Sequence, residues 1–194
     1  TCADGPFKCA TCVTIRNVKQ KKSRVSIQNS KLKIGKNQIG ILIVNTEKCN
    51  IQSNYIISKD NTFSFPAYQG IVVAGEIVDN VHIINNTIHG VFQGIHIGTS
   101  HKEYTPGAPD LAGTVIVSGN NIHCFYKKTT DRGRHGIFVG NCNSLVISDN
   151  YLLLDIIPNY EIAEIKDLKS MVVQVIPFDQ TGNRQQAGSG LLFA

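Results

Sequence analysis

Apolar and polar residues alternate over short runs along this chain, and the runs form one phrase that is repeated. Each copy begins with a glycine and an alternating run, as in residues 40–43. After a turn comes a second run that ends on Asn and an apolar residue, as in residues 49–56. Alternation over so few residues predicts short β-strands that each bury one face. Further copies begin at Gly70, Gly94 and Gly136, and a degenerate copy runs from Val13 to Leu32.

The copies are joined by turns that are too short for crossover helices, so each copy is expected to stack on the one before it. A coil of three short strands is the simplest arrangement that buries all of these faces. Without insertions, one coil takes about 22 residues, a usual length for a parallel β-helix. We therefore predict one all-β domain over residues 1–194, with regular coils in residues 13–152 and a C-terminal cap with an extra strand in residues 153–194.

One asparagine recurs at the same place in four copies, at Asn54, Asn86, Asn120 and Asn150. An inward Asn tolerates the left-handed backbone of a sharp turn, and its amide can bond the equivalent amides above and below in a ladder. We interpret these residues as structural rather than catalytic. For the same reason, we expect the sequon at residues 85–87 to form a turn rather than a glycosylation site.

The repeats over Val13 to Leu152 resemble the pectate-lyase-like superfamily, and within it the short-repeat branch often called NosD-like. The resemblance implies a right-handed, single-stranded parallel β-helix. It also implies a first sheet from the Gly-Ile-x-Ile runs, a second sheet from the Val-x-Ile runs, and a short third sheet. It slightly favours a secreted or cell-surface location without fixing the compartment. The third sheet is expected to begin at Ile56, Ile88, Ile122 and Leu152.

The segment after Leu152 breaks the repeat. Residues 160–169 place acidic side chains early and lysines late, which suits a short helix that complements its dipole, and residues 171–175 read as a further strand. We expect this region to cap the solenoid. The chain begins at Thr1 without an initiator Met, so we expect a processed form or a fragment.

Composition narrows the function classes. The chain is 42% hydrophobic and 17% charged, and no apolar run is long enough to cross a bilayer, so membrane insertion is not expected. A formal net charge of +5 favours acidic partners. Among these we favour an acidic polysaccharide over nucleic acid, and an oligomer is possible. The basic residues that cluster between Lys19 and Lys36 are interpreted as solvated outer positions of the first coils.

The six cysteines do not read as one disulfide framework. Cys49 occupies a position that is Val81 in the next coil, so it is expected to be a small core residue. For the cluster of Cys2, Cys9 and Cys12, a half zinc site, a terminal disulfide and free thiols all stay open, as does a bond between Cys124 and Cys142. We predict no bound metal ion and no cofactor.

Three insertions interrupt the regular coils, at residues 58–69, 99–113 and 125–134, and all three flank the first sheet. Walls on both sides of a sheet make a groove, and the resemblance implies that a polysaccharide is bound over this sheet. The outward residue of each strand would form the groove floor. That floor reads Leu42, Val72, His96 and Phe138.

The groove suggests candidate catalytic and binding residues. We expect His96 or His135 to act as a base near neutral pH, with Arg134 neutralising a uronate. Side chains that could stack on sugar rings or pair with a carboxylate or sulfate are predicted to bind substrate; they are Phe138, Arg132, Tyr104, Lys102 and Lys127. His82, His89 and His123 are expected on other faces of the coils and are interpreted as structural.

Several enzyme families are disfavoured because their motifs are missing. The chain has no pair of facing carboxylates for inverting glycoside hydrolysis, and its floor has no acidic cluster for calcium. A metal-independent polysaccharide lyase or uronate epimerase remains as the enzymatic hypothesis. The alternatives are a binding module that uses the same groove, and a non-catalytic structural, adhesin or tail-fibre-type module.

Overall fold

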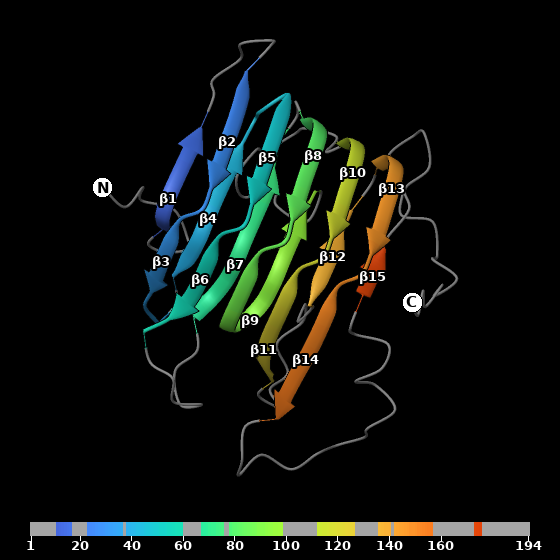
Figure 1. Cartoon of the computed structure of the whole chain (residues 1–194). Coiled ribbons are helices and arrows are strands. Elements are labelled where there is room, and N and C mark those ends of the chain that lie inside the picture. The colour runs from blue at the N-terminus through green and yellow to red at the C-terminus, as the bar shows by residue number, and fades with distance from the viewer. Residues whose placement is uncertain are drawn as a thin grey trace.

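In the part of the chain that the structure describes, fifteen β-strands, all paired in parallel, wind into an elongated β-solenoid (Figure 1). The computed structural model describes residues 11–16, 23–36, 38–59, 67–75, 78–98, 112–126, 136–140, 142–156 and 173–175. These residues contain strands and turns only, so none of them belongs to a helix that could span a membrane. The predicted all-β parallel solenoid is confirmed.

Successive strands are assigned in turn to the three predicted sheets. The first sheet contains β1 (Thr11–Arg16), β4 (Ile39–Val44), β7 (Ala67–Ala74), β12 (Ile137–Val139) and β15 (Val173–Val175). The second contains β2 (Arg24–Gln28), β5 (Lys48–Gln52), β8 (Val78–Ile84), β10 (Ala112–Ser118) and β13 (Cys142–Ser148). The third contains β3 (Lys31–Ile34), β6 (Tyr55–Ser58), β11 (Asn121–Tyr126) and β14 (Tyr151–Ile156).

Strand β9 (Thr87–Ile97) belongs to both the third and the first sheet, and this differs from the expectation of three separate sheets. Its first part pairs with β6 and its second part with β7, so hydrogen bonds join the two sheets into one ten-stranded sheet. The bend falls at Gly90, whose φ is +79°, in the left-handed region that side chains disfavour. Glycine thus lets one strand turn the corner without a loop.

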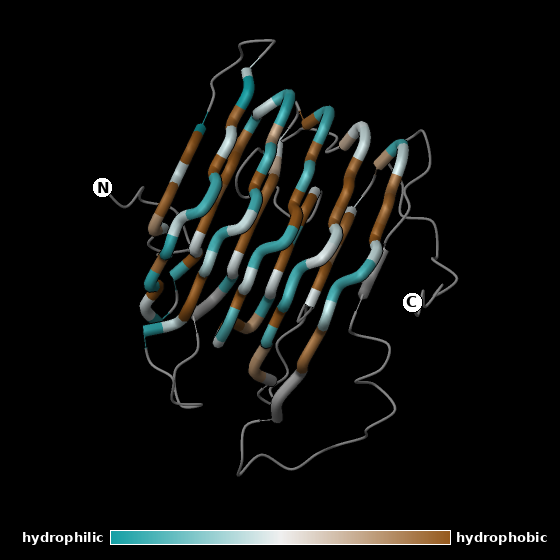
Figure 2. The backbone as a smooth tube through the Cα atoms, viewed as in Figure 1, coloured by the Kyte–Doolittle hydropathy of each residue, from teal (hydrophilic) through white to brown (hydrophobic). Residues whose placement is uncertain are grey.

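The inward residues of neighbouring strands stack in rows along the solenoid. On the first sheet the row runs from Ile41 through Ile71 and Ile95 to Ile137, and all four are fully buried. On the second sheet, Figure 2 shows apolar and polar positions alternating along the strands. Because each strand supplies the same face at the same place, one apolar core runs the length of the coils.

The predicted asparagine ladder is present at the turn between the second and third sheets. The amide nitrogens of Asn54, Asn86 and Asn120 each donate to the side-chain oxygen of the next ladder asparagine, over 3.0, 3.0 and 2.9 Å. Each of these nitrogens also donates to a backbone carbonyl of the preceding coil. The buried amides are therefore satisfied both along the ladder and against the backbone.

The left-handed backbone lies one residue earlier than the ladder, which corrects the sequence-based interpretation. Positive φ angles occur at Ser53, Asn85, Gly119 and Asp149, each of which precedes a ladder asparagine. The turn and the ladder are thus made by two neighbouring residues. Asn85 carries the turn of the sequon at residues 85–87, and its side chain is exposed.

The C-terminal strand expected at residues 171–175 is present as β15, which pairs with β12 and adds a strand to the first sheet. The helix expected at residues 160–169 and the predicted cap lie outside the described residues. So do the domain ends at residues 1–10 and 176–194.

Two cysteines are core residues, as expected for Cys49. Burial raises the pKa of Cys49 to about 12, and burial also raises the pKa of Cys124 to about 12. Neither of them forms a disulfide, nor do exposed Cys12 and half-buried Cys142, so Cys124 and Cys142 do not bond to each other. Buried neutral thiols of this kind are unreactive, because the thiolate is the nucleophile.

We expect Cys49 and Cys124 to resist a thiol reagent in the folded protein, while Cys12 reacts at once. Unfolded thiols have a pKa near 9.0, so these two groups stabilise the fold fully below that pH and lose this contribution as the pH rises towards 12. The loss should reach about 1.4 kcal/mol per thiol and pH unit. Thiol counting with and without denaturant tests the first point. The second is tested by comparing the alkaline unfolding of wild type with Cys49→Val, which should flatten the pH slope.

Candidate functional site

The outward row that the sequence proposes as a groove floor is formed in register. Leu42 pairs with Val72, Val72 with His96, and His96 with Phe138. These side chains are buried, however: His96 is 5% exposed and Phe138 is 3% exposed. The row is therefore continuous, as expected, but it is not an open floor.

A second apolar cluster accompanies this burial over β4 and β7. Ile39, Leu42, Val44, Val72 and Ala74 pack together on the outer face of the first sheet, separate from the core inside the coils. Each large aliphatic side chain contributes about 1.5–3 kcal/mol when it is buried and little when it faces water. Apolar residues on both faces of β4 and β7 thus favour a sheet that is covered on both sides.

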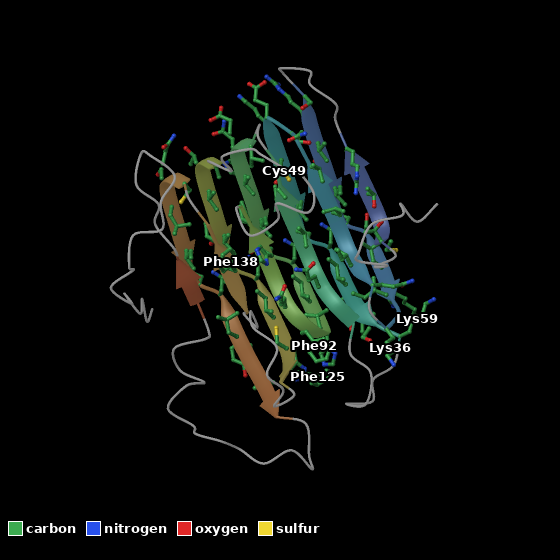
Figure 3. All side chains as sticks on the ribbon, turned by 180° about the vertical axis from the view of Figure 1, so that it is seen from behind. Lys36, Cys49, Lys59, Phe92, Phe125 and Phe138 are labelled. Atoms are coloured by element: carbon green, nitrogen blue, oxygen red, sulfur yellow. The ribbon has the colours of Figure 1, made fainter. Side chains whose placement is uncertain are left out.

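The covered face becomes more polar and aromatic at β9 and β12. The rings of His96 and Phe138 lie 4.3 Å apart between centroids, at an angle of 45°. Figure 3 shows Phe138 on this part of the ribbon. The side chain of Gln69 on β7 donates to that of Gln93 on β9 over 2.5 Å, and both are buried. His96 is thus held in a packed layer.

The other proposed groove residues lie outside the described residues. They are His135, Arg134, Arg132, Tyr104, Lys102 and Lys127. Their catalytic and binding roles stay predictions, and so does the catalytic role of His96.

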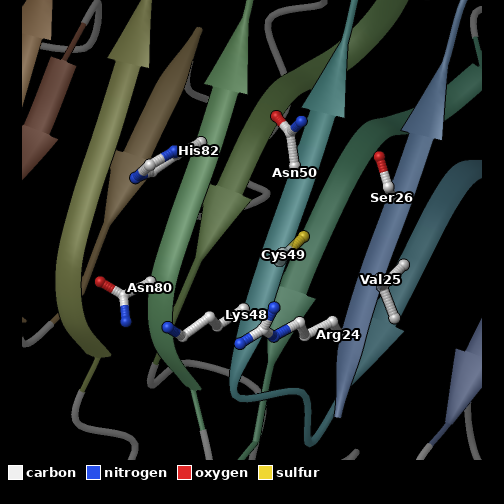
Figure 4. A pocket seen from close by; sticks show the side chains of 8 residues that line it. All are labelled: Arg24, Val25, Ser26, Lys48, Cys49, Asn50, Asn80 and His82. Carbon is white, nitrogen blue, oxygen red and sulfur yellow. The ribbon is translucent and has the colours of Figure 1, made fainter.

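An open depression of about 350 Å³ lies on the second sheet instead (Figure 4). It crosses β2, β5 and β8, and its polar lining comes from the outward residues of these strands. The lining residues are Arg24, Val25, Ser26, Lys48, Cys49, Asn50, Asn80 and His82. The depression therefore follows the solenoid axis across three coils.

The repeat places these side chains in two rows. Arg24, Lys48 and Asn80 share one register position on the three strands. Ser26, Asn50 and His82 share the next outward position. Neighbouring strands lie about 4.8 Å apart, so each row presents polar groups at that spacing.

The lining of the depression is electrostatically one-sided. Arg24 and Lys48 are exposed neighbours in the same row, and no carboxylate lines the depression. The acidic residues nearest in sequence are Glu47, which immediately precedes β5, and Asp79, the second residue of β8. Asp79 accepts a hydrogen bond from Asn80 over 2.9 Å. Two like charges side by side attract a dianionic or repeating anionic ligand.

Sequence reasoning missed this site because it treated its residues separately. Arg24 was part of a basic cluster interpreted as solvated surface, and His82 was interpreted as structural. The signal was in the repeat itself. Aligning Val25, Cys49 and Val81 as inward residues also aligns the outward residues that precede them, and so brings Arg24 next to Lys48.

In the described part of the chain, no three His, Cys, Asp or Glu side chains gather as a metal cluster. Comparison with family models, with curated proteins and with solved structures finds no match for this chain. What the structure establishes for this chain is therefore its fold, a parallel β-solenoid with a buried asparagine ladder.

Proposed function

We propose that this protein binds an acidic polysaccharide, and that the depression on the second sheet is a binding surface for it. The observation that carries this proposal is the pair of exposed cations, Arg24 and Lys48, which lie side by side on the adjacent strands β2 and β5 and line a depression of about 350 Å³. The proposal keeps the ligand class expected from the net charge of +5. It moves the contact from the covered first sheet to an open face.

The chemistry of the lining suits sugars that carry carboxylate or sulfate groups. The guanidinium of Arg24 can pair with such a group through two parallel hydrogen bonds, and Lys48 adds a point charge beside it. Asn50, Asn80 and Ser26 offer both donors and acceptors, which match sugar hydroxyl groups. A chain that runs along the solenoid axis would meet these groups in successive coils.

The resemblance to pectate-lyase-like β-helices supports the same ligand class, since members of that superfamily bind polysaccharides along the solenoid. Catalysis would add a lyase or epimerase step over the first sheet, with His96 or His135 as base and Arg134 beside it. Binding at the depression does not require that step. We therefore propose binding as the primary activity.

We expect the double variant Arg24→Ala/Lys48→Ala to bind an acidic polysaccharide at least tenfold more weakly than wild type, because it removes both cations of the depression. A glycan array would first select an acidic ligand, and isothermal titration calorimetry at two salt concentrations would then measure affinity. Binding should weaken as salt rises, since exposed charges are screened.

The control is Lys33→Ala/Lys59→Ala, which removes two exposed positive charges elsewhere and should leave affinity unchanged. Equal loss in both double variants would show attraction by net charge alone and would contradict the proposed site. An ultraviolet assay for unsaturated product, run with wild type and His96→Gln, tests the catalytic form. Product that is lost in His96→Gln would place the ligand on the first sheet instead.

A structural role is the second candidate, and the exposed apolar residues favour it. Among the described residues, Tyr151 is 61% exposed, Val146 46% and Leu153 38%, and all three lie on the last two strands of the coils, β13 and β14; the other exposed large apolar side chain, Tyr55, lies on β6. Large apolar side chains grouped at one end of a solenoid are typical of a protein contact. A mass that rises with concentration, together with no binding on the glycan array, would favour an assembly, adhesin or tail-fibre-type module.

A further inference from the structure

Two histidines from neighbouring coils meet on the outer face of the third sheet, away from the depression. His89 on β9 pairs with His123 on β11, and their ring centroids lie 4.3 Å apart at an angle of 77°. Both side chains are half-buried. The sequence repeat brings them together because each precedes the corner at which its strand turns towards the first sheet.

The corner restrains both rings. The buried ring of Phe125 lies 4.8 Å from the ring of His123 and 6.0 Å from that of His89, in edge-to-face contacts. Figure 3 marks Phe125 at this corner. Next to His89, a Cβ on Gly90 would come within 2.9 Å of Ser58, so the backbone is closely packed there. The pair is thus held from behind by tight packing.

The separation of the rings suits two ligands of one metal ion. Two imidazoles that occupy adjacent positions at a bond length of 2.0–2.1 Å would have centroids about 4.5–5 Å apart. The observed 4.3 Å is slightly shorter than this separation. We propose that His89 and His123 form a two-histidine site for a divalent first-row transition ion such as Zn²⁺, with water completing its coordination.

Among the described residues, the neighbours in the same row add no further ligand to these two histidines. Ile57 precedes His89 in register and Leu153 follows His123, and neither side chain can coordinate a metal. Lys33 lies in the same row beyond Ile57 and adds positive charge. We therefore expect modest affinity and readily exchanged water ligands. A bound ion would link β9 to β11 and stabilise the folded chain by mass action.

The test is a Zn²⁺ titration of the whole chain by isothermal titration calorimetry, with a thermal melt at each end point. His89→Gln and His123→Gln should each lower the affinity at least tenfold and abolish the increase in Tm. His82→Gln is the matched control. His82 has Asn50 and Ile116 as row neighbours, so the His82→Gln variant should bind Zn²⁺ with the same affinity as wild type. Cys12→Ser removes the exposed thiol and should likewise leave the site intact.

Unchanged affinity in both His89→Gln and His123→Gln would overturn the proposal, as would a loss that follows Cys12→Ser alone. The NMR signals of the imidazole rings give a second measurement. It uses the wild-type protein and so does not depend on whether a variant folds. Addition of Zn²⁺ should shift the signals of His89 and His123 together. Shifts confined to other histidines would also refute the site.

Discussion

Replacement of Asn86 by alanine is expected to lower the free energy of unfolding by about 3 to 5 kcal/mol. The side-chain oxygen of Asn86 accepts hydrogen bonds from both the backbone and the side-chain nitrogen of Asn54. Its nitrogen donates to the carbonyl of Ile51 over 2.9 Å and to Asn120 over 3.0 Å. The same nitrogen also donates to the carbonyl of Ile84 over 3.1 Å. Alanine removes all of these bonds at once, in a site that is 1% exposed.

The magnitude follows from the groups that are left behind. The backbone N–H of Asn54 and the carbonyl of Ile51 would both lose this partner inside the solenoid. A buried donor or acceptor without a partner costs about 1–3 kcal/mol, which exceeds the net value of a hydrogen bond. Because the ladder crosses four coils, the loss should also loosen the pairing on both sides of Asn86.

Chemical denaturation of Asn86→Ala and of wild type measures this loss of stability. Two further variants test whether the ladder causes it. Asn86→Asp keeps the volume but cannot donate to Ile51, so it should be destabilised about as strongly at neutral pH. Asn121→Ala removes an exposed asparagine from the same turn region and should change stability by less than about 0.5 kcal/mol. If Asn121→Ala cost as much as Asn86→Ala, the ladder would not be the cause.

The coils could be predicted from the sequence because two independent patterns agree there. Alternation identified the inward residues, such as Ile41 and Ile71, and the periodic asparagine fixed where each coil turns. Both patterns report local constraints that every coil must satisfy. In a repeat fold, the same pattern therefore occurs in every coil, and the fold can be predicted even when one copy is degenerate.

The continuous corner in β9 and the position of the left-handed residue could not be predicted in the same way. Both depend on the backbone of one residue, Gly90 in the first case and Asn85 in the second. Asparagine tolerates the left-handed region and also forms side-chain ladders. Because residues 85 and 86 are both asparagine, the sequence does not show which one adopts the left-handed backbone and which one joins the ladder. Only the geometry separates them.

The candidate sites were harder to predict than the fold, because alternation shows which residues point outward but not whether that face is open. Leu42 and His96 were placed on the correct face, yet both are buried. Arg24 and Lys48, on another face, line the open depression. Outward apolar residues are therefore better interpreted as a covered layer, and outward polar rows as the place to search for a ligand.

Replacement of Gly70 by alanine should be about as damaging as loss of the ladder, through backbone contact instead of hydrogen bonding. The glycines that begin each phrase stack above one another on the first sheet. A Cβ on Gly70 would lie 2.6 Å from the carbonyl oxygen of Gly94 and 2.5 Å from a methyl group of Ile88. Neither can move away freely, because one belongs to the next coil's backbone and the other to a fully buried side chain.

We therefore expect Gly70→Ala to cost about 3 kcal/mol or more, since added atoms in a tightly packed site force backbone shifts. Gly35→Ala is the control, because its Cβ would meet only the flexible end of Gln38, at 3.2 Å. Urea unfolding of both variants compares them directly. A mild effect at Gly70 would mean that neighbouring coils can separate locally. The stacked glycines would then not be required for the coils to pack together.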